Sequence, residues 1–214
     1  GLITYETSTT TIPNDTASRL ATSPTWMQEN WGNAKFDNDT LNLILHEYQH
    51  NNIWAAGDGS VKQGHAAHSW CIFRKSDFKI LLTGVANVAV NPMYATSYRP
   101  ECASILAAAT FLHILSQQVD VTASTVIFFS DNNEAVTNSC CRFFHNIKRV
   151  LENDIDITLT FTEYIKQVKS TFIVHHVKGH QDDDVIHHRL DPIAKINVLM
   201  DELVGNFITT VIDQ

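Results

Sequence analysis

The fold is decided by residues 53–60, IWAAGDGS, in which a short apolar run meets an acidic residue between two glycines. An apolar run of this length that is closed by Gly, Asp and Ser is typical of a β-strand followed by a turn. We therefore predict a strand that begins at Ile53 and ends at Asp58. Three further acidic motifs follow in order along the chain: SYRPE (Ser97–Glu101), SDN (Ser130–Asn132) and MDEL (Met200–Leu203).

The segments around these motifs alternate between strand-like and helix-like patterns. Residues 66–73 and 78–84 are expected to form an antiparallel meander with the first strand, because only short turns separate the three. Pro100 and Pro192 each mark the first turn of a helix, where a missing N–H costs little, and Asp191 is a suitable N-cap. The remaining patterns predict helices over 101–117, 133–152, 156–168 and 192–206, and strands over 125–129 and 171–177.

This order, β-β-β-α-β-α-α-β-α, predicts an α/β fold. Helical connections lead from the first strand to the fourth and from the fourth to the fifth, so we expect these three strands to lie parallel. The sheet would be mixed and five-stranded, with a three-stranded antiparallel meander and two parallel strands, and helices would flank it. Sheets of this kind place their chemistry at the carboxyl ends of parallel strands. Asp58 and Asp131 would face each other there.

The composition is that of a globular protein with a hydrophobic core. Of the 214 residues 44% are hydrophobic, and no apolar run indicates a membrane span or a signal peptide. The four cysteines form no CxxC pair and two of them are adjacent, so we expect reduced thiols in an intracellular protein, cytoplasmic or nuclear and not secreted. The net charge of −8 argues against strong unassisted binding to nucleic acid, which normally needs a basic face.

The beginning of the chain differs from the rest in composition and in periodicity. Residues 1–25 are rich in Thr, Ser, Asn and Pro and show little periodicity, which is typical of a linker. Residues 39–50 carry apolar side chains at helical spacing. We therefore expect residues 1–50 to be a linker or N-terminal extension with one short helix, and residues 51–214 to form the folded domain. Since the first residue is Gly1, we expect the sequence to be a piece of a longer polypeptide.

The acidic motifs predict a site for divalent metal ions. Carboxylates that converge from separate elements cost free energy unless a cation compensates them. Carboxylate oxygens favour hard divalent cations, and such cations are typical of phosphoryl-transfer chemistry. Each motif taken singly has an ordinary structural interpretation as a turn, a helix cap or a helix-dipole residue, so their joint order carries the hypothesis. The four candidates are Asp58, Glu101, Asp131 and Asp201.

Together with VKGH at Val177–His180, these motifs resemble those of a ribonuclease H domain, specifically the kind that follows the reverse transcriptase in a retroelement polyprotein. The resemblance covers roughly residues 52–212. It implies an RNase H-like fold and an endonuclease that hydrolyses the RNA strand of an RNA–DNA hybrid. It also implies two Mg²⁺ ions, for which Mn²⁺ would substitute. The catalytic residues that hold these ions would be Asp58, Glu101, Asp131 and Asp201.

The same resemblance implies roles for further residues. Asp58 would bridge the two ions, which together activate a water and stabilise the leaving oxygen of an in-line displacement. His180 would be a catalytic residue that moves a proton near the leaving group, since imidazole titrates near neutral pH. Ser60, Asn132 and Asn197 would bind the substrate. The implied partners are an RNA–DNA hybrid and a tethered reverse transcriptase domain, with no membrane.

Other interpretations stay open at this point. A catalytically decayed ribonuclease H module would serve as a nucleic-acid-binding or polymerase-supporting scaffold and would take up no Mg²⁺. A transposase or integrase of the same fold usually carries Glu as its last carboxylate, where this chain offers Asp201. A zinc site among His175, His176 and the histidines that follow is disfavoured, because neighbouring strand residues point to opposite faces and no cysteine lies at ligand spacing.

Overall fold

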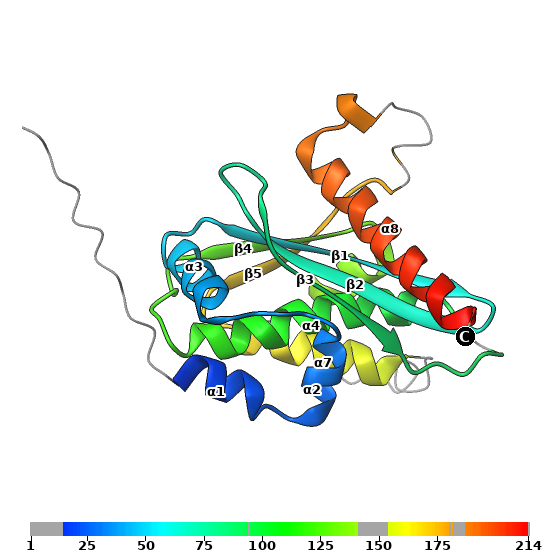
Figure 1. Ribbon diagram of the computed structural model, residues 1–214, viewed down its shortest axis with the longest axis horizontal. Coiled ribbons are helices and arrows are strands. Elements are labelled where there is room, and N and C mark those ends of the chain that lie inside the picture. Colours follow the sequence, from blue (N-terminus) through cyan, green and yellow to red (C-terminus); the bar gives the residue numbers. More distant parts are fainter. Residues whose placement is uncertain (1–14, 94, 141–153, 180, 182–186, 214) are drawn as a thin grey trace, which may run out of the picture.

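The computed structural model shows a five-stranded sheet with helices on both faces (Figure 1). Helices α4 and α7 lie on one side of the sheet, and α8 crosses the other side. The structure describes residues 15–93, 95–140, 154–179, 181 and 187–213. Among these residues no helix is both long and apolar enough to cross a membrane.

From β1 onward the elements follow the predicted order in the described part of the chain. The predicted helix over 133–152 begins as expected, and its part after Cys140 lies outside the described residues. The helices are α1 (Asp15–Ala21), α2 (Thr25–Trp31), α3 (Asn38–Gln49), α4 (Tyr98–Ser116), α5 (Asn133–Cys140), α7 (Ile155–Gln167) and α8 (Pro192–Ile212), with a short 3-10 helix at His187–Arg189. The strands are β1 (Ile53–Lys62), β2 (His65–Arg74), β3 (Ile80–Val88), β4 (Thr125–Ser130) and β5 (Thr171–His176).

The strands are arranged in the order β3-β2-β1-β4-β5, with β1 at the centre. β1 is antiparallel to β2 along its whole length and parallel to β4 only at Ala55 and Ala56. The prediction that the first strand ends at Asp58 is therefore wrong. Pairing with β4 stops before Asp58, but pairing with β2 carries β1 on to Lys62. The third strand begins at Ile80 and not at the predicted residue 78, because the φ of Phe78, 59°, lies outside the β region.

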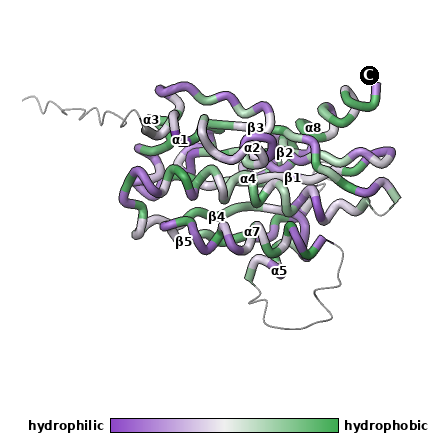
Figure 2. Tube along the Cα trace, turned by 90° about the horizontal axis from the view of Figure 1, so that it is seen from below, coloured by the Kyte–Doolittle hydropathy of each residue, from purple (hydrophilic) through white to green (hydrophobic). Residues whose placement is uncertain are grey.

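Alternate residues of the strands face two separate hydrophobic layers, as the pleat of a sheet requires. Trp70 and Ile72 of β2 face the layer beneath α4 and α7, whereas Cys71 and Phe73 face the layer beneath α8. Figure 2 views the molecule from the side of α4 and α7, with hydrophobic residues along α4 and the strands behind it. Most residues of α4 are buried, on nearly all sides of the helix, so α4 lacks the wide polar face of a surface helix.

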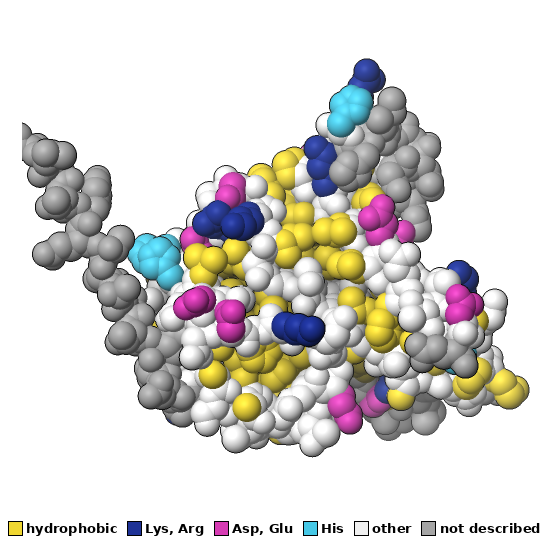
Figure 3. All heavy atoms as spheres, viewed as in Figure 1, with side chains coloured by type: hydrophobic (Ala, Val, Ile, Leu, Met, Phe, Trp, Pro, Cys, Tyr) yellow, Lys and Arg dark blue, Asp and Glu magenta, His cyan; other side chains and the backbone are white. Residues whose placement is uncertain are grey.

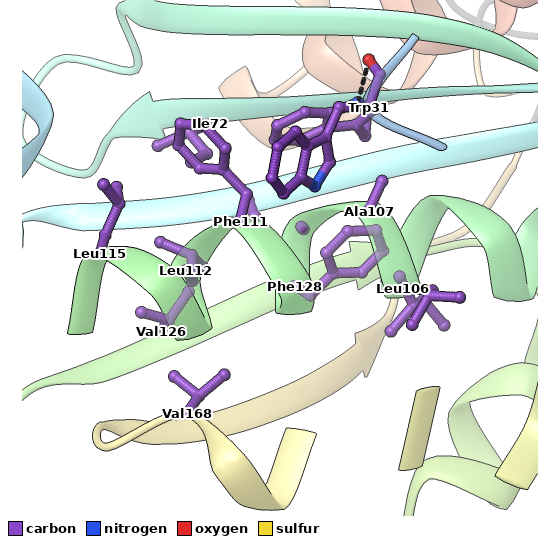
Figure 4. Packing of buried hydrophobic residues seen from close by; sticks show 14 of the residues in the cluster. Trp31, Ile72, Leu106, Ala107, Phe111, Leu112, Leu115, Val126, Phe128 and Val168 are labelled. Atoms are coloured by element: carbon purple, nitrogen blue, oxygen red, sulfur yellow. Dashed lines mark hydrogen bonds between the residues drawn. The ribbon is translucent and has the colours of Figure 1, made fainter. Parts of the chain in front are cut away.

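Helices α1 to α3 pack against this first layer. Residues 1–25 were expected to lack regular structure, but α1 and the start of α2 fall within them. The Trp31 side chain lies among residues of α4 and the sheet, with its ring edge-on to Phe111 at 5.8 Å (Figure 4). The main-chain oxygen of Trp31 accepts a hydrogen bond from Trp70 Nε1 at 3.2 Å, and Trp31 Nε1 donates to Thr110 Oγ1 at 2.9 Å. The domain boundary after residue 50 stays a prediction, and its test is given in the Discussion.

Helix α8 begins as predicted. The Asp191 side chain accepts hydrogen bonds from the main-chain N–H groups of Ile193 and Ala194, and Pro192 occupies the first turn. The helix continues past the expected end near Asn206 to Ile212, because Ile208 remains buried against Ala67 of β2. This long helix carries the last acidic motif across the face of the sheet.

Candidate metal centre

Three of the four candidate carboxylates meet at the edge of the sheet. Asp58, Glu101 and Asp131 each offer an oxygen that lies within 4.8 Å of the others. β1 and β4 are parallel with Ala56 opposite Phe129, so the register carried on by two residues sets Asp58 opposite Asp131. Glu101 comes from the first turn of α4, which begins beside β1. Three separate elements therefore bring their carboxylates to one point.

Glycines in two of the motifs allow these elements to approach closely. A Cβ at Gly59 would lie far inside contact distance of the main-chain nitrogen of Glu101. A Cβ at Gly179 would lie equally close to the Asp131 carboxylate. Side chains at either position would push the neighbouring carboxylate away. The close approach of neighbouring elements at the site thus explains why glycine occupies positions 59 and 179.

Gly57 has a related role. A Cβ at this position would meet the Cβ of Ser104 at 2.7 Å and the main-chain oxygen of Ser69 at 2.7 Å. Since a real Cβ atom does not make contacts this short, α4 can lie against β1 only because residue 57 has no side chain. The glycine therefore brings α4, and with it Glu101, onto the sheet.

Replacing Gly59 by Ala is expected to separate Glu101 from the other two carboxylates. The added methyl group collides with the main chain of α4, which must move because backbone atoms do not rotate out of the way. We expect a loss of about 1–3 kcal/mol in the free energy of unfolding and weaker Mn²⁺ binding by isothermal titration calorimetry.

Gly205→Ala is the matched control. A Cβ there meets nothing within 4 Å, so Ala should stabilise α8 by up to about 1 kcal/mol. Unchanged Mn²⁺ binding in a folded Gly59→Ala variant would contradict the close-approach argument.

The electrostatics of the cluster favour a bound cation. Asp58 and Glu101 are only 5% and 3% exposed. Burial, followed by the charge of Asp131, raises the pKa of Asp58 to about 7. Burial, followed by the charge of Asp58, raises the pKa of Glu101 well above its ordinary value. Each carboxylate thus resists ionisation by itself, and a divalent cation with hard oxygen ligands would offset both the desolvation and the repulsion. The donor set fits Mg²⁺ or Mn²⁺.

A cavity of about 710 Å³ opens above the three carboxylates. Asp201 lines this cavity from α8 and is exposed, and its negative charge contributes to raising the pKa of Asp58. It lies outside the group of three whose oxygens are mutually within 4.8 Å. The cavity therefore has a tight acidic floor and a fourth carboxylate on its wall.

The predicted substrate-binding residues also line the cavity. Ser60, Asn132 and Asn197 all contribute to its wall. Asn197 is 3% exposed, and its Oδ1 has no hydrogen-bond partner among the described residues. The Asn132 side-chain oxygen Oδ1 accepts from the main-chain N–H of Ala135 at 2.9 Å and so caps α5. His180 lies outside the described residues, and its predicted role stays a prediction.

One residue of the site escaped notice in the sequence. Ser130, the last residue of β4, is fully buried and contacts the Glu101 carboxylate. It stands directly before Asp131 in the third motif, but a serine beside an acid is so common in turns that sequence alone gives it no role. Only the placement of α4 against β4 reveals the contact.

Comparisons with known proteins agree with this architecture. No protein-family model matches the chain, and no curated protein matches it in sequence. The structure of LC11-RNase H1, isolated from compost by a metagenomic approach, matches with a TM-score of 0.51 and 16% identity, over 76% of this chain and 99% of that one. The crystal structure of LC11-RNase H1 in complex with an RNA/DNA hybrid matches with a TM-score of 0.50 and 14% identity, over 72% of this chain and 94% of that one.

A weaker likeness relates the chain to the solution structure of the PFV RNase H domain. It has 14% identity and a TM-score of 0.48, over 72% of this chain and 91% of that one. That score is too low to support the predicted retroelement context. The two stronger matches and the sheet order β3-β2-β1-β4-β5 confirm the fold class that the sequence predicts: the chain has the ribonuclease H fold.

Proposed function

We propose that this protein is a divalent-metal-dependent endonuclease that hydrolyses the RNA strand of RNA–DNA hybrids. The observation that carries the proposal is the meeting of Asp58, Glu101 and Asp131 beneath a cavity that Asp201 also lines. Carboxylates so buried and so close are costly unless they hold a cation. A fold shared with LC11-RNase H1, whose crystal structure contains an RNA/DNA hybrid, supports the choice of substrate.

In this proposal Asp58 would be a ligand of both Mg²⁺ ions, Glu101 and Asp131 would hold one of them, and Asp201 would hold the other. Bound there, the pair would activate a water and stabilise the leaving oxygen at phosphorus, giving 5′-phosphate and 3′-hydroxyl ends. Asp201 is exposed, whereas the other three carboxylates are more enclosed, so this side of the proposed centre would face solvent and a nucleic acid strand could approach it. Asn197, which lines the cavity from α8, would bind the substrate beside Asp201.

Selectivity for RNA would depend on the 2′-hydroxyl groups of one strand, which are what distinguishes RNA from DNA in a hybrid. Affinity is a separate matter. The net charge is −8, and on the face shown in Figure 3 the Lys and Arg side chains are scattered and form no continuous stripe. Phosphate contacts of the domain alone would be few. We therefore propose that a tethered reverse transcriptase domain of a retroelement polyprotein supplies most of the binding, inside the cell.

The decisive experiment incubates the purified protein with labelled RNA–DNA hybrid, duplex DNA and duplex RNA, with Mg²⁺ or with EDTA. We expect Mg²⁺-dependent cleavage of the RNA strand of the hybrid only. Asp131→Asn should reduce cleavage by at least about a thousandfold, because losing a metal ligand forfeits several kcal/mol of transition-state stabilisation.

Asp39→Asn is the control for this experiment, since it removes the same charge from the exposed first turn of α3. It should cleave like the unmodified protein. Cutting of duplex DNA at the same rate would contradict the proposed selectivity. A folded protein that takes up no Mn²⁺ by calorimetry would instead favour the decayed module that acts as a scaffold.

A further inference from the structure

We propose that Ser130 is a positioning residue, which holds the Glu101 carboxylate in the orientation that metal binding requires and ties it to the turn that carries Asp131. The inference rests on the proposed function, because it assigns a role toward the metal ions of that site. It concerns the strength of metal binding, which can be measured without any nuclease assay.

Two hydrogen bonds of the Ser130 hydroxyl define the geometry. Its oxygen lies 3.3 Å from Glu101 Oε2 and 3.1 Å from the main-chain nitrogen of Asn132. Ser130 is fully buried and Glu101 is 3% exposed, so water competes little for either contact. The hydroxyl therefore bridges the start of α4 and the turn after β4, the two elements that bring Glu101 and Asp131 together.

The direction of these hydrogen bonds follows from the groups involved. The Asn132 N–H can only donate, so the Ser130 oxygen accepts this bond and its own proton stays available. That proton points to Glu101 Oε2, so Ser130 donates to the Glu101 carboxylate and accepts from the Asn132 N–H. The two hydrogen bonds together fix the position of the Glu101 carboxylate relative to the turn that carries Asp131.

The backbone around Ser130 is itself firmly held. Its main-chain oxygen accepts from the N–H of Val177 at 2.9 Å, and Ser130 is paired with His176 of β5. A hydroxyl on a residue anchored in a parallel ladder has little freedom to move. Partners of this kind, which hydrogen-bond a ligating carboxylate and sit on rigid elements, typically change metal affinity by about 10- to 100-fold when removed.

Ser130→Ala removes this oxygen and leaves the rest of the side chain in place. We expect its affinity for Mn²⁺, measured by isothermal titration calorimetry, to fall by about 10- to 100-fold. Ser130→Thr keeps the hydroxyl and should bind Mn²⁺ within a few-fold of the unmodified protein. The same order should appear in the Mn²⁺ concentration that gives half-maximal thermal stabilisation, which needs no catalysis.

Ser104→Ala is the matched control. Ser104 is also fully buried, and its hydroxyl also donates to Glu101, but to the main-chain oxygen at 2.7 Å and not to the carboxylate. Its removal should lower stability slightly and leave Mn²⁺ affinity unchanged. Equal losses of affinity in both variants would show that Ser130 acts only through general packing, and would overturn the inference.

A double-mutant cycle with Glu101→Gln decides the matter if the Thr variant does not fold. Glu101→Gln removes the charge that Ser130 is proposed to orient, so adding Ser130→Ala should then change Mn²⁺ affinity by less than about threefold. A full additional loss would overturn the inference. Absence of Mn²⁺ binding in the unmodified protein would count against the proposed function itself, whereas unchanged binding in Ser130→Ala would count against the role of Ser130 alone.

Discussion

Replacing Asp58 by Asn is expected to remove nearly all of the proposed nuclease activity and, at pH 8 without metal, to make the protein more stable. The two effects have one cause, the enclosure of a carboxylate at 5% exposure beside two others. In the absence of metal, burial and the neighbouring charges raise the pKa of Asp58 to about 7. At pH 8 the group is ionised at a cost to the folded state, and an amide carries no such cost.

The pH dependence follows from the same pKa. The folded protein holds the Asp58 proton more tightly than the unfolded chain, where an Asp titrates near its ordinary value of 3.8. The free energy of unfolding should therefore fall as the pH rises from about 4 through about 7, and level off above that. The raised pKa of Glu101 acts in the same direction. The increase in the pKa of Asp58 alone, from 3.8 to about 7, corresponds to a change in the free energy of unfolding on the order of 4 kcal/mol.

The stabilisation by Asn will be smaller than this figure, because the amide still has to find hydrogen-bond partners in a buried place. We expect a gain of roughly 1–3 kcal/mol at pH 8 with EDTA, little difference at pH 5, and no stabilisation by Mg²⁺. Urea denaturation at both pH values measures this. Glu29→Gln on α2 is the control, since it removes one exposed negative charge. A metal-free Asp58→Asn protein that is less stable than the unmodified one at pH 8 would refute the account.

The sequence predicted the architecture of the site well, for a physical reason. Two of the acidic motifs stand at the boundary of an element, one at the start of α4 and one at the end of β4. At such boundaries Gly, Pro and Asp leave a local signal that needs no knowledge of the fold. Asp191 and Pro192 therefore marked the start of α8 correctly. Asp58 lies within β1, just past the point where its pairing with β4 stops, and this parallel pairing brings it close to Asp131 at the end of β4.

What the sequence did not predict depends on contacts between elements. The length of β1 is set by β2, which pairs with it beyond Asp58, and no pattern in residues 53–62 shows this. The roles of Gly57 and Ser130 likewise depend on how closely α4 approaches the sheet. Local signals specify where an element starts, but packing decides how far it continues and what its polar side chains touch.

The beginning of the chain shows the same limit most clearly. Helices α1 and α2 are only seven residues each, too short for a periodic pattern to stand out from a polar sequence. Their helical structure depends on a few large apolar side chains that meet the core. Helix α3 contributes similar side chains. The buried apolar residues of the three helices, all at most 6% exposed, are Leu20, Met27, Trp31, Leu41, Ile44, Leu45 and Tyr48.

Trp31→Ala is expected to destabilise the protein by about 3–5 kcal/mol, the usual cost of emptying a large buried aromatic site. Trp31 is 3% exposed, and its removal also breaks the hydrogen bond to Thr110. Trp26→Ala on the same helix is the matched control. Trp26 is 41% exposed and touches the ring of Tyr164, so its loss should cost no more than roughly 1 kcal/mol. Thermal and urea denaturation of both variants would measure the difference.

A chain that starts at residue 51 tests the predicted domain boundary by the same reasoning. It lacks the seven buried side chains named above, each of which contributes about 1.5–3 kcal/mol by burial. Their sum, on the order of 10–20 kcal/mol, equals or exceeds the whole stability of a typical domain. The shortened chain would also leave Trp70 Nε1 without its acceptor on Trp31. We therefore expect it to be unfolded or aggregated. If it instead denatures cooperatively and binds Mn²⁺ as the longer chain does, residues 15–50 are an extension that the ribonuclease H fold can lose.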